Sequence, residues 1–102
     1  MRIEWLEQAL DDFDAAIAYL DEQNPQAARK IAKVIHLQVQ QLHQMPLIGR
    51  LGRVENTREL VVPGTHFIIP YRFDGYHLIE LLAIMHDARE WPEKFDSPES
   101  PA

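Results

Sequence analysis

The spacing of apolar residues divides the chain into a helical first half and an extended second half. Residues 2–5 alternate between polar and apolar side chains, as a short strand does. Through residues 7–22 and again through residues 25–44, apolar side chains recur every three or four positions, which places them on one side of a helix. The two stripes are Leu6, Leu10, Phe13, Ile17 and Leu20, and Ala28, Ile31, Ile35, Val39 and Leu42. The pattern therefore predicts a strand followed by two amphipathic helices.

An Asn-Pro pair separates the two predicted helices. Asn24 suits the N-cap, because its side-chain oxygen can accept hydrogen bonds from the free N–H groups of the first turn. Pro25 suits the first helical position, where its missing N–H costs nothing. Pro46, after Met45, ends the second helix. Because so short a break joins them, we expect the two helices to form an antiparallel hairpin.

The second half of the chain has the two-residue period of β-strands. Residues 46–56, which contain two glycines, predict a loop. Alternating segments then predict strands over residues 57–62, 66–73 and 76–86. Pro63-Gly64 is typical of a type II turn, and Asp74-Gly75 is typical of a two-residue hairpin turn. We therefore expect these three strands to form an antiparallel meander.

The predicted elements follow the order β-α-α-β-β-β, which is an α+β fold. Helices followed by a meander should pack as a helical hairpin on one face of an antiparallel sheet. Pro70 has no N–H for a ladder, so we expect it at a bulge or with its nitrogen directed away from a neighbouring strand. We expect residues 1–92 to form a single domain and the polar, Pro- and Ser-containing residues 93–102 to form a disordered tail.

Composition and charge narrow the classes of function. The chain of 102 residues contains no cysteine, which excludes disulfides, thiolate metal sites and cysteine nucleophiles. Its net charge of −6 is uneven, because residues 1–28 carry seven acids and one Arg, residues 29–72 carry seven bases and two acids, and residues 73–102 carry seven acids and two bases. This total argues against a general binder of polyanions, since neutralising phosphates requires a local excess of Lys and Arg. It allows one basic patch on an acidic body.

Nothing in the chain predicts a membrane segment, a metal site or a cofactor. The N-terminus has no apolar segment typical of a secretion signal, and the apolar stretch around residues 78–85 contains Glu80 and is too short to span a bilayer. His36 and His43 share a helix face but lack a third ligand at a useful spacing. We therefore expect a cytoplasmic protein without a metal or cofactor.

Several short strings occur along the chain in a characteristic order. They are Asn24-Pro25 with Ala27-Ala28, PLIGRLGR at residues 46–53, TRELVVPGT at residues 57–65, Tyr71-Arg72, and HDAREWP at residues 86–92. In order and spacing they resemble the RelE/ParE superfamily of type II toxins, over residues 1–92. The resemblance implies a growth inhibitor encoded beside a cognate antitoxin, whose disordered segment folds on the toxin. We expect the acid-rich outer face of the first helix, at Asp11, Asp12 and Asp14, to contact that antitoxin.

Two activities occur on the fold of this superfamily, and the resemblance leaves both open. RelE-like members cleave mRNA on the ribosome, whereas ParE-like members poison DNA gyrase. Metal-free RNA cleavage needs a base for the 2′-hydroxyl, a cation for the phosphorane and an acid for the leaving oxygen. If the chain is such an endoribonuclease, the resemblance implies the catalytic candidates Arg58, Arg72 and His86, together with Tyr71, and Glu59 is a possible base on chemical grounds. The candidates for contact with a substrate or target are Arg50, Arg53 and Arg89.

The same residues also have structural interpretations. Arg58 and Glu59 can pair with other charges, a histidine at a strand end is more often a structural hydrogen bonder than a catalyst, and Trp91 is expected to cap the core with its indole. RelE-like toxins tend to be strongly basic, whereas this chain is acidic and has no Lys in residues 34–93. This difference slightly favours a gyrase inhibitor. A ribosome-dependent endoribonuclease and a decayed toxin that only binds its partner remain the alternatives.

Overall fold

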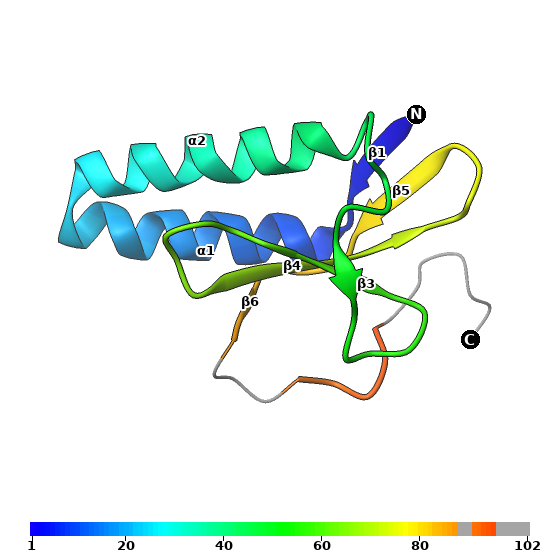
Figure 1. Cartoon of the computed structure of the whole chain (residues 1–102). Coiled ribbons are helices and arrows are strands. Elements are labelled where there is room, and N and C mark those ends of the chain that lie inside the picture. The colour runs from blue at the N-terminus through cyan, green and yellow to red at the C-terminus, as the bar shows by residue number, and fades with distance from the viewer. Residues whose placement is uncertain (88–90, 96–102) are drawn as a thin grey trace.

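The computed structural model describes residues 1–87 and 91–95 (Figure 1). In chain order its elements are β1 (Arg2–Trp5), α1 (Glu7–Gln23), α2 (Pro25–Gln41), β2 (Arg50–Leu51), β3 (Arg58–Val61), β4 (Phe67–Phe73), β5 (Leu78–Leu81) and β6 (Met85–His86). The α+β class and the order of elements are those predicted, with an additional short strand inside the predicted loop and the last strand divided in two. Most of the predicted tail, residues 96–102, lies outside the described residues. No helix in the described part is long and apolar enough to cross a membrane.

The helical hairpin turns where the sequence predicts. Asn24 Oδ1 accepts hydrogen bonds from the N–H groups two and three residues later, at 3.1 and 3.2 Å, and α2 starts at the next residue. The end of α2 differs from the prediction, because the helix stops at Gln41 rather than at residue 44. Beyond that point the N–H of Leu42 donates to Val39 O at 3.0 Å, so the last turn is tighter than an α-helix.

The strands form one mixed sheet in the order β1-β5-β4-β3-β2, and β6 pairs with the start of β4. Each adjacent pair from β2 to β5 is antiparallel, which confirms the meander predicted for β3, β4 and β5. The expectation of an entirely antiparallel sheet is wrong at one edge, because β1 pairs in parallel with β5, Arg2 opposite Leu78 and Trp5 opposite Leu81. A parallel pair needs a long crossover between its strands. The helical hairpin and the strands β2 to β4 form that crossover.

The connection between β4 and β5 is longer than the predicted two-residue turn. The N–H of Asp74 donates to Leu78 O at 3.0 Å, and Asp74 Oδ1 accepts from the N–H groups of Tyr76, His77 and Leu78 at 2.8 to 3.0 Å. Gly75 has a φ of 80°, which a side chain would disfavour. The prediction of a tight hairpin is therefore corrected to a loop that the Asp74 carboxylate organises.

The predicted strand over residues 76–86 is interrupted. It consists of β5 and β6, and residues 82–84 between them lie outside the strands. Pro70 O accepts a hydrogen bond from Leu82 N at 2.9 Å, and in an extended strand the nitrogen of a residue points to the same side as its carbonyl. The missing N–H of Pro70 therefore faces the interrupted stretch, which is a bulge-like position of the kind predicted.

A side chain of α1 satisfies the backbone where the strand is interrupted. Asp12 Oδ2 accepts a hydrogen bond from Ile84 N at 2.9 Å, and Asp12 Oδ1 accepts one from Gln8 Nε2 at 2.7 Å. Ile84 is buried, and a buried N–H without a partner is costly. Asp12 therefore ties α1 to the sheet across 72 residues of chain.

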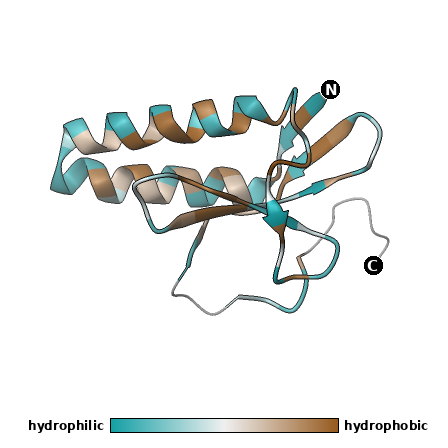
Figure 2. Cartoon of the chain, in the orientation of Figure 1, coloured by the Kyte–Doolittle hydropathy of each residue, from teal (hydrophilic) through white to brown (hydrophobic). Residues whose placement is uncertain are grey.

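The core lies between the helical hairpin and one face of the sheet, and Figure 2 shows the apolar positions gathered along both helices and along β4 and β5. The buried cluster comprises Ala9, Ile35, Val39 and Leu42 from the helical half, and Leu60, Val62, Ile69, Tyr71, Ile79, Leu81 and Ile84 from the sheet half. Along β4, Ile69 and Tyr71 face this core. The alternating residues Pro70 and Arg72, together with Glu59 opposite Pro70, face the other side, which we call the distal face.

We expect Asp12→Ala to lower the free energy of unfolding by about 1–3 kcal/mol, because the substitution leaves the N–H of Ile84 buried without a partner. Urea unfolding followed by circular dichroism measures the change. Asp11→Ala is the matched control, since Asp11 is an exposed acid on the same helix, and it should cost less than about 0.5 kcal/mol. Equally small effects from both substitutions would contradict a tie through Asp12.

Candidate functional site

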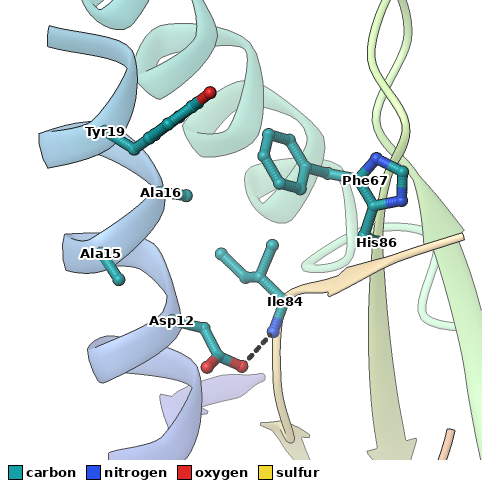
Figure 3. Close-up of a pocket in the computed structure, with 7 residues that line it drawn as sticks. All are labelled: Asp12, Ala15, Ala16, Tyr19, Phe67, Ile84 and His86. Carbon is teal, nitrogen blue, oxygen red and sulfur yellow. Dashed lines mark hydrogen bonds between the residues drawn. The ribbon is translucent and has the colours of Figure 1, made fainter. Parts of the chain in front are cut away.

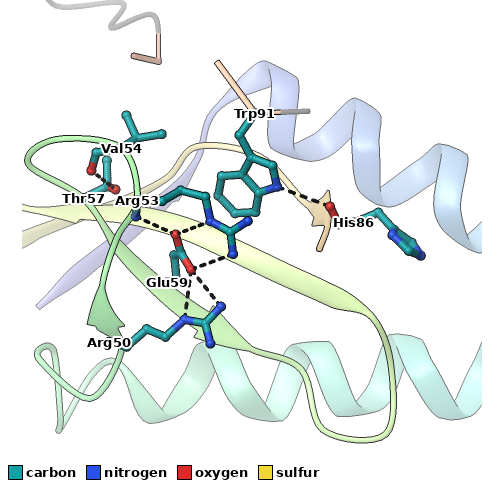
Figure 4. Close-up of polar contacts among 7 residues, drawn as sticks. All are labelled: Arg50, Arg53, Val54, Thr57, Glu59, His86 and Trp91. Carbon is teal, nitrogen blue, oxygen red and sulfur yellow. Dashed lines mark hydrogen bonds and ion pairs between the residues drawn. The ribbon is translucent and has the colours of Figure 1, made fainter. Parts of the chain in front are cut away.

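A buried carboxylate on the distal face holds two arginines. Glu59 is 2% exposed, and its Oε1 accepts a hydrogen bond from Arg50 Nε at 2.9 Å. Its Oε2 accepts from the backbone N–H of Arg53 at 2.8 Å and from Arg53 Nε at 3.0 Å (Figure 4). We call these three residues the Glu59 clamp. Since β2 and β3 set Arg50 opposite Glu59, the clamp fastens the edge strand and the following loop to the sheet.

The electrostatics of the clamp keep Glu59 ionised. Burial by itself would raise the pKa of this carboxyl, but the hydrogen bonds from Arg53 and Arg50 outweigh it and hold the pKa below its ordinary value. Both oxygens are occupied by cationic donors. In this arrangement Glu59 is therefore a weak base and is suited to structure rather than to proton abstraction.

Trp91 extends the clamp across the distal face. The guanidinium of Arg53 lies 3.9 Å from the centre of the indole ring, and Trp91 Nε1 donates to His86 O at 3.3 Å (Figure 4). The stacking is a cation–π contact. The expectation that Trp91 caps the core is corrected, because the indole covers Arg53 on the side of the sheet away from the helices.

Arg58 and Tyr71 hold the loop that follows α2. Arg58 Nη1 donates to Gly49 O at 2.9 Å and to Leu47 O at 3.3 Å. The Tyr71 hydroxyl donates to Pro46 O at 2.8 Å and accepts from Gly49 N at 2.9 Å, and burial raises the pKa of this hydroxyl. Only glycine allows the approach, because a Cβ at Gly49 would lie 2.6 Å from the Tyr71 ring.

Arg72 pairs with an acid that the sequence analysis did not include among the candidates. Arg72 Nη2 lies 3.3 Å from Glu80 Oε1, across the β4–β5 ladder. Glu80 is buried, and its second oxygen, Oε2, has no hydrogen-bond partner. In the sequence, the only signal for this pair is an acid within an otherwise apolar strand. The register that places Glu80 opposite Arg72 is set by the pairing of β4 with β5, which the sequence pattern does not give.

His86 lies on the helix side of the sheet. It is opposite Phe67 in the β4–β6 ladder, and its ring stacks on His66 with centroids 5.3 Å apart. Nδ1 of each of these two histidines lies 3.5 Å from a different carboxylate oxygen of Asp87. Figure 4 shows the imidazole of His86 directed away from the Glu59 clamp.

A groove of about 340 Å³ lies beside His86, between α1 and the end of the sheet (Figure 3). Its lining residues are Asp12, Ala15, Ala16, Tyr19, Phe67, Ile84 and His86. Small and aromatic side chains dominate the lining, and Tyr19 is 64% exposed. We call this hollow the α1 groove. Asp11 and Asp14 are exposed on the same helix, whereas the Asp12 carboxylate is already bound to Ile84 N.

The structure brings Arg58 and Tyr71 together at the loop after α2, but it does not gather the five catalytic candidates at one place. His86 is opposite Phe67, and Arg72 lies five residues further along β4, a separation of roughly 16 Å at the rise of a strand. Glu59 is held in its clamp, while Arg58 and Tyr71 bind loop carbonyls. Arg89 lies outside the described residues. Among residues 1–87 and 91–95, no three His, Asp or Glu side chains gather in a way that could hold a metal ion.

The lowered pKa of Glu59 predicts a contribution to acid stability. A carboxyl whose folded pKa is depressed stabilises the fold above its unfolded pKa, near 4.5, and this contribution is lost as the pH falls through the folded pKa. We therefore expect Glu59→Gln to lower the melting temperature at pH 7. Below pH 4.5 the melting temperature of this variant should fall less steeply than that of the wild type, because the ionisable carboxyl is gone. Melting curves from pH 7 to pH 3 test this, with the exposed Glu55→Gln as control. If the melting temperature of Glu59→Gln falls with pH as steeply as that of the wild type, Glu59 does not contribute to acid stability.

Comparison with known proteins agrees with this geometry. The sequence profile described as ParE toxin of type II toxin-antitoxin system, parDE, matches residues 3–91. A candidate toxin of Sinorhizobium fredii, Y4kP, is 38% identical over 92 residues, which cover 90% of this chain and 94% of that protein. A solved structure described as the chromosomal ParDE TA system from P. aeruginosa superposes with a TM-score of 0.74 at 28% identity, covering 84% of this chain and 95% of that one. The chain therefore belongs to the ParE toxin family of type II toxin-antitoxin systems.

Proposed function

We propose that this toxin acts in the cytoplasm by binding DNA gyrase, and that a cognate antitoxin silences it. Membership of the family and the likeness to the ParDE system support the antitoxin partner. The observation that carries the choice of gyrase over mRNA is the engagement of the charged candidates with one another and with the backbone. These paired side chains stabilise the fold and are not available for catalysis. The toxin then acts by binding its target rather than by cleaving it.

The arrangement of charges favours this proposal over an endoribonuclease. Cleavage of RNA without a metal needs a base, an acid and a cation within reach of one phosphodiester. Arg72 is paired with Glu80, Glu59 is clamped by two arginines, and His86 lies on the other side of the sheet. The net charge of −6 would also oppose docking on ribosomal RNA.

The α1 groove is the surface that we propose for part of the antitoxin. It offers apolar walls from Ala16, Phe67 and Ile84 and a tyrosine at its rim. Asp11 and Asp14 stand exposed on the helix that forms one wall, so a partner segment with apolar residues and Lys or Arg fits both features. Of the three acids proposed for this contact, Asp12 contributes as a lining residue and as the tie to Ile84, rather than as a free charge.

Induction of the chain alone in bacteria should stop DNA synthesis and produce filaments, while protein synthesis continues at first. Purified toxin should trap gyrase–DNA cleavage complexes, and His86→Ala should retain at least about half of this activity, because an inhibitor that acts by binding needs no acid or base. Pulse labelling of new DNA and new protein distinguishes the targets. An immediate fall in translation, lost in Arg72→Ala and His86→Ala variants that still fold, would support the endoribonuclease instead. No effect on growth would indicate a decayed toxin.

Charge reversal beside the α1 groove should weaken the antitoxin complex. We expect Asp14→Lys to raise the Kd for the antitoxin encoded by the adjacent reading frame by about tenfold, because rim charges opposite a basic partner change from attraction to repulsion. Isothermal titration measures the Kd. Glu55→Lys makes the same chemical change at an exposed acid of the loop after β2 and should leave the Kd unchanged. If both variants bind like the wild type, the acidic face of α1 does not contact the antitoxin.

A further inference from the structure

The two helices of the hairpin carry charges of opposite sign. α1 contains six acids and no base, whereas α2 contains no acid and three bases, Arg29, Lys30 and Lys33. All three bases are exposed, and we call them the α2 basic face. A chain with a net charge of −6 therefore includes one basic helix, which is a patch of the kind that its uneven charge allowed.

The α2 basic face lies on the side of the helix opposite the core. At about 100° per residue, the three bases fall within an arc of roughly 100°, and the buried Ala28, Ile35 and Val39 lie on the other side. Gln26 and His36 are exposed next to the bases. The first turn of α2 contains no acid, so the positive end of the helix dipole adds to the field of the bases instead of being neutralised.

The bases of this face have no partner within the described part of the chain. None of the three forms an ion pair or a side-chain hydrogen bond there, whereas Arg50 and Arg53 on the sheet bind a carboxylate. Like charges three and four residues apart on a helix repel each other, and Lys33 stands at these distances from Lys30 and Arg29. Folding therefore does not account for the arrangement, which favours a role in binding an anion.

The composition of the face fits the phosphate backbone of a nucleic acid better than a protein surface. Lysine is depleted in protein interfaces, which rely on buried aromatic and apolar anchors. The exposed positions from residue 26 to residue 36 are all polar, and an exposed apolar side chain follows only at Leu37. Arg, Lys and Gln are typical donors to phosphate oxygens. Arg29 and Lys33 lie about 6 Å apart along the helix axis, so both can contact phosphates of one duplex, which carries a charge every ~1.7 Å.

The overall charge decides where such a backbone is encountered. Three cations neutralise only about three phosphates, and the net charge of −6 opposes the approach of free DNA. The face is therefore suited to a duplex that another contact has already brought close. DNA held by gyrase meets this condition, because a toxin bound to gyrase experiences that DNA at a high effective concentration.

We propose that the α2 basic face contacts the phosphate backbone of the duplex DNA held by gyrase. This inference rests on the proposed function, because it assumes that the toxin binds gyrase through another of its surfaces. The toxin then bridges the enzyme and its DNA. A ligand that binds both together favours the joined state over the state in which the DNA has dissociated, which is how the contact contributes to trapping.

The first test compares two double variants that each remove one Arg and one Lys. Arg29→Gln with Lys33→Gln neutralises two cations of the face, and glutamine keeps the helix because its propensity is close to that of Arg and Lys. The toxin concentration for half-maximal trapping of gyrase–DNA cleavage complexes should rise about tenfold, and the salt dependence of binding to DNA-bound gyrase should lose a slope of about two. Arg2→Gln with Lys94→Gln, at exposed bases outside α2, is the control and should act like the wild type.

Binding to gyrase without DNA separates the outcomes. The α2 double variant should bind DNA-free gyrase with the affinity of the wild type. An equal loss of affinity with and without DNA would overturn the proposal and assign the face to the gyrase protein. Unchanged binding and trapping in both cases, or a loss confined to the antitoxin complex, would also overturn it. If the wild-type toxin neither binds gyrase nor traps its complexes, the proposed function itself fails.

Lysine labelling tests the wild-type toxin without any variant. The chain has three lysines, of which Lys30 and Lys33 belong to the face and Lys94 does not. Acetylation of the first two by an amine-reactive reagent should fall about threefold or more when DNA is added to the toxin–gyrase complex, because an amine paired with phosphate is shielded. Lys94 should be labelled equally in both states. Labelling of Lys30 and Lys33 that does not respond to DNA would contradict the contact.

Discussion

The missing N–H of Pro70 shapes the part of the molecule where the sheet meets α1. Because β4 has no donor at this position, the neighbouring strand is interrupted at residues 82–84 and resumes as β6. The interruption frees the N–H of Ile84, and Asp12 of α1 accepts it. The α1 groove and the orientation of His86 toward the helix side both lie at this junction. One constraint on the backbone thus links the helical hairpin, the groove and the end of the sheet.

Ion pairs hold the distal face together with buried apolar side chains such as Ile68 and Pro70. The Glu59 clamp joins β2 and the following loop to β3, and Trp91 lies on Arg53, so a residue close to the C-terminus is fixed against the edge of the sheet. A buried ion pair stabilises a fold only when its partners are well hydrogen-bonded, and losing one partner is costly. Glu59 meets this condition with both oxygens occupied. Arg72 and Glu80 meet it less completely, because one oxygen of Glu80 has no partner.

These charge pairs give a structural role to the arginines at the positions where the resemblance implies a nuclease site. Each arginine on the sheet that the structure describes binds an acid or a carbonyl of its own chain, while the rim of the α1 groove and the outer face of α1 expose apolar and acidic side chains. Under the proposed function, a partner segment that covers these features needs apolar residues together with Lys or Arg. A disordered chain can present all of them along its length.

The sequence by itself determined the first strand, the two helices and the three-strand meander, and their order, but not the short strand β2 or the division of the last strand into β5 and β6. Local physical chemistry suffices for this, because the helical stripes, the Asn24 cap and the alternation along β4 each depend on residues near one another in the chain. It also indicated that Pro70 would disturb the ladder. Only the tertiary structure decided the partners: the parallel pairing of β1 with β5, the clamp around Glu59, the pairing of Arg72 with Glu80 and the side of the sheet on which His86 lies. These depend on register and strand order, which are set when distant segments pack together, and no periodicity within a single segment records them.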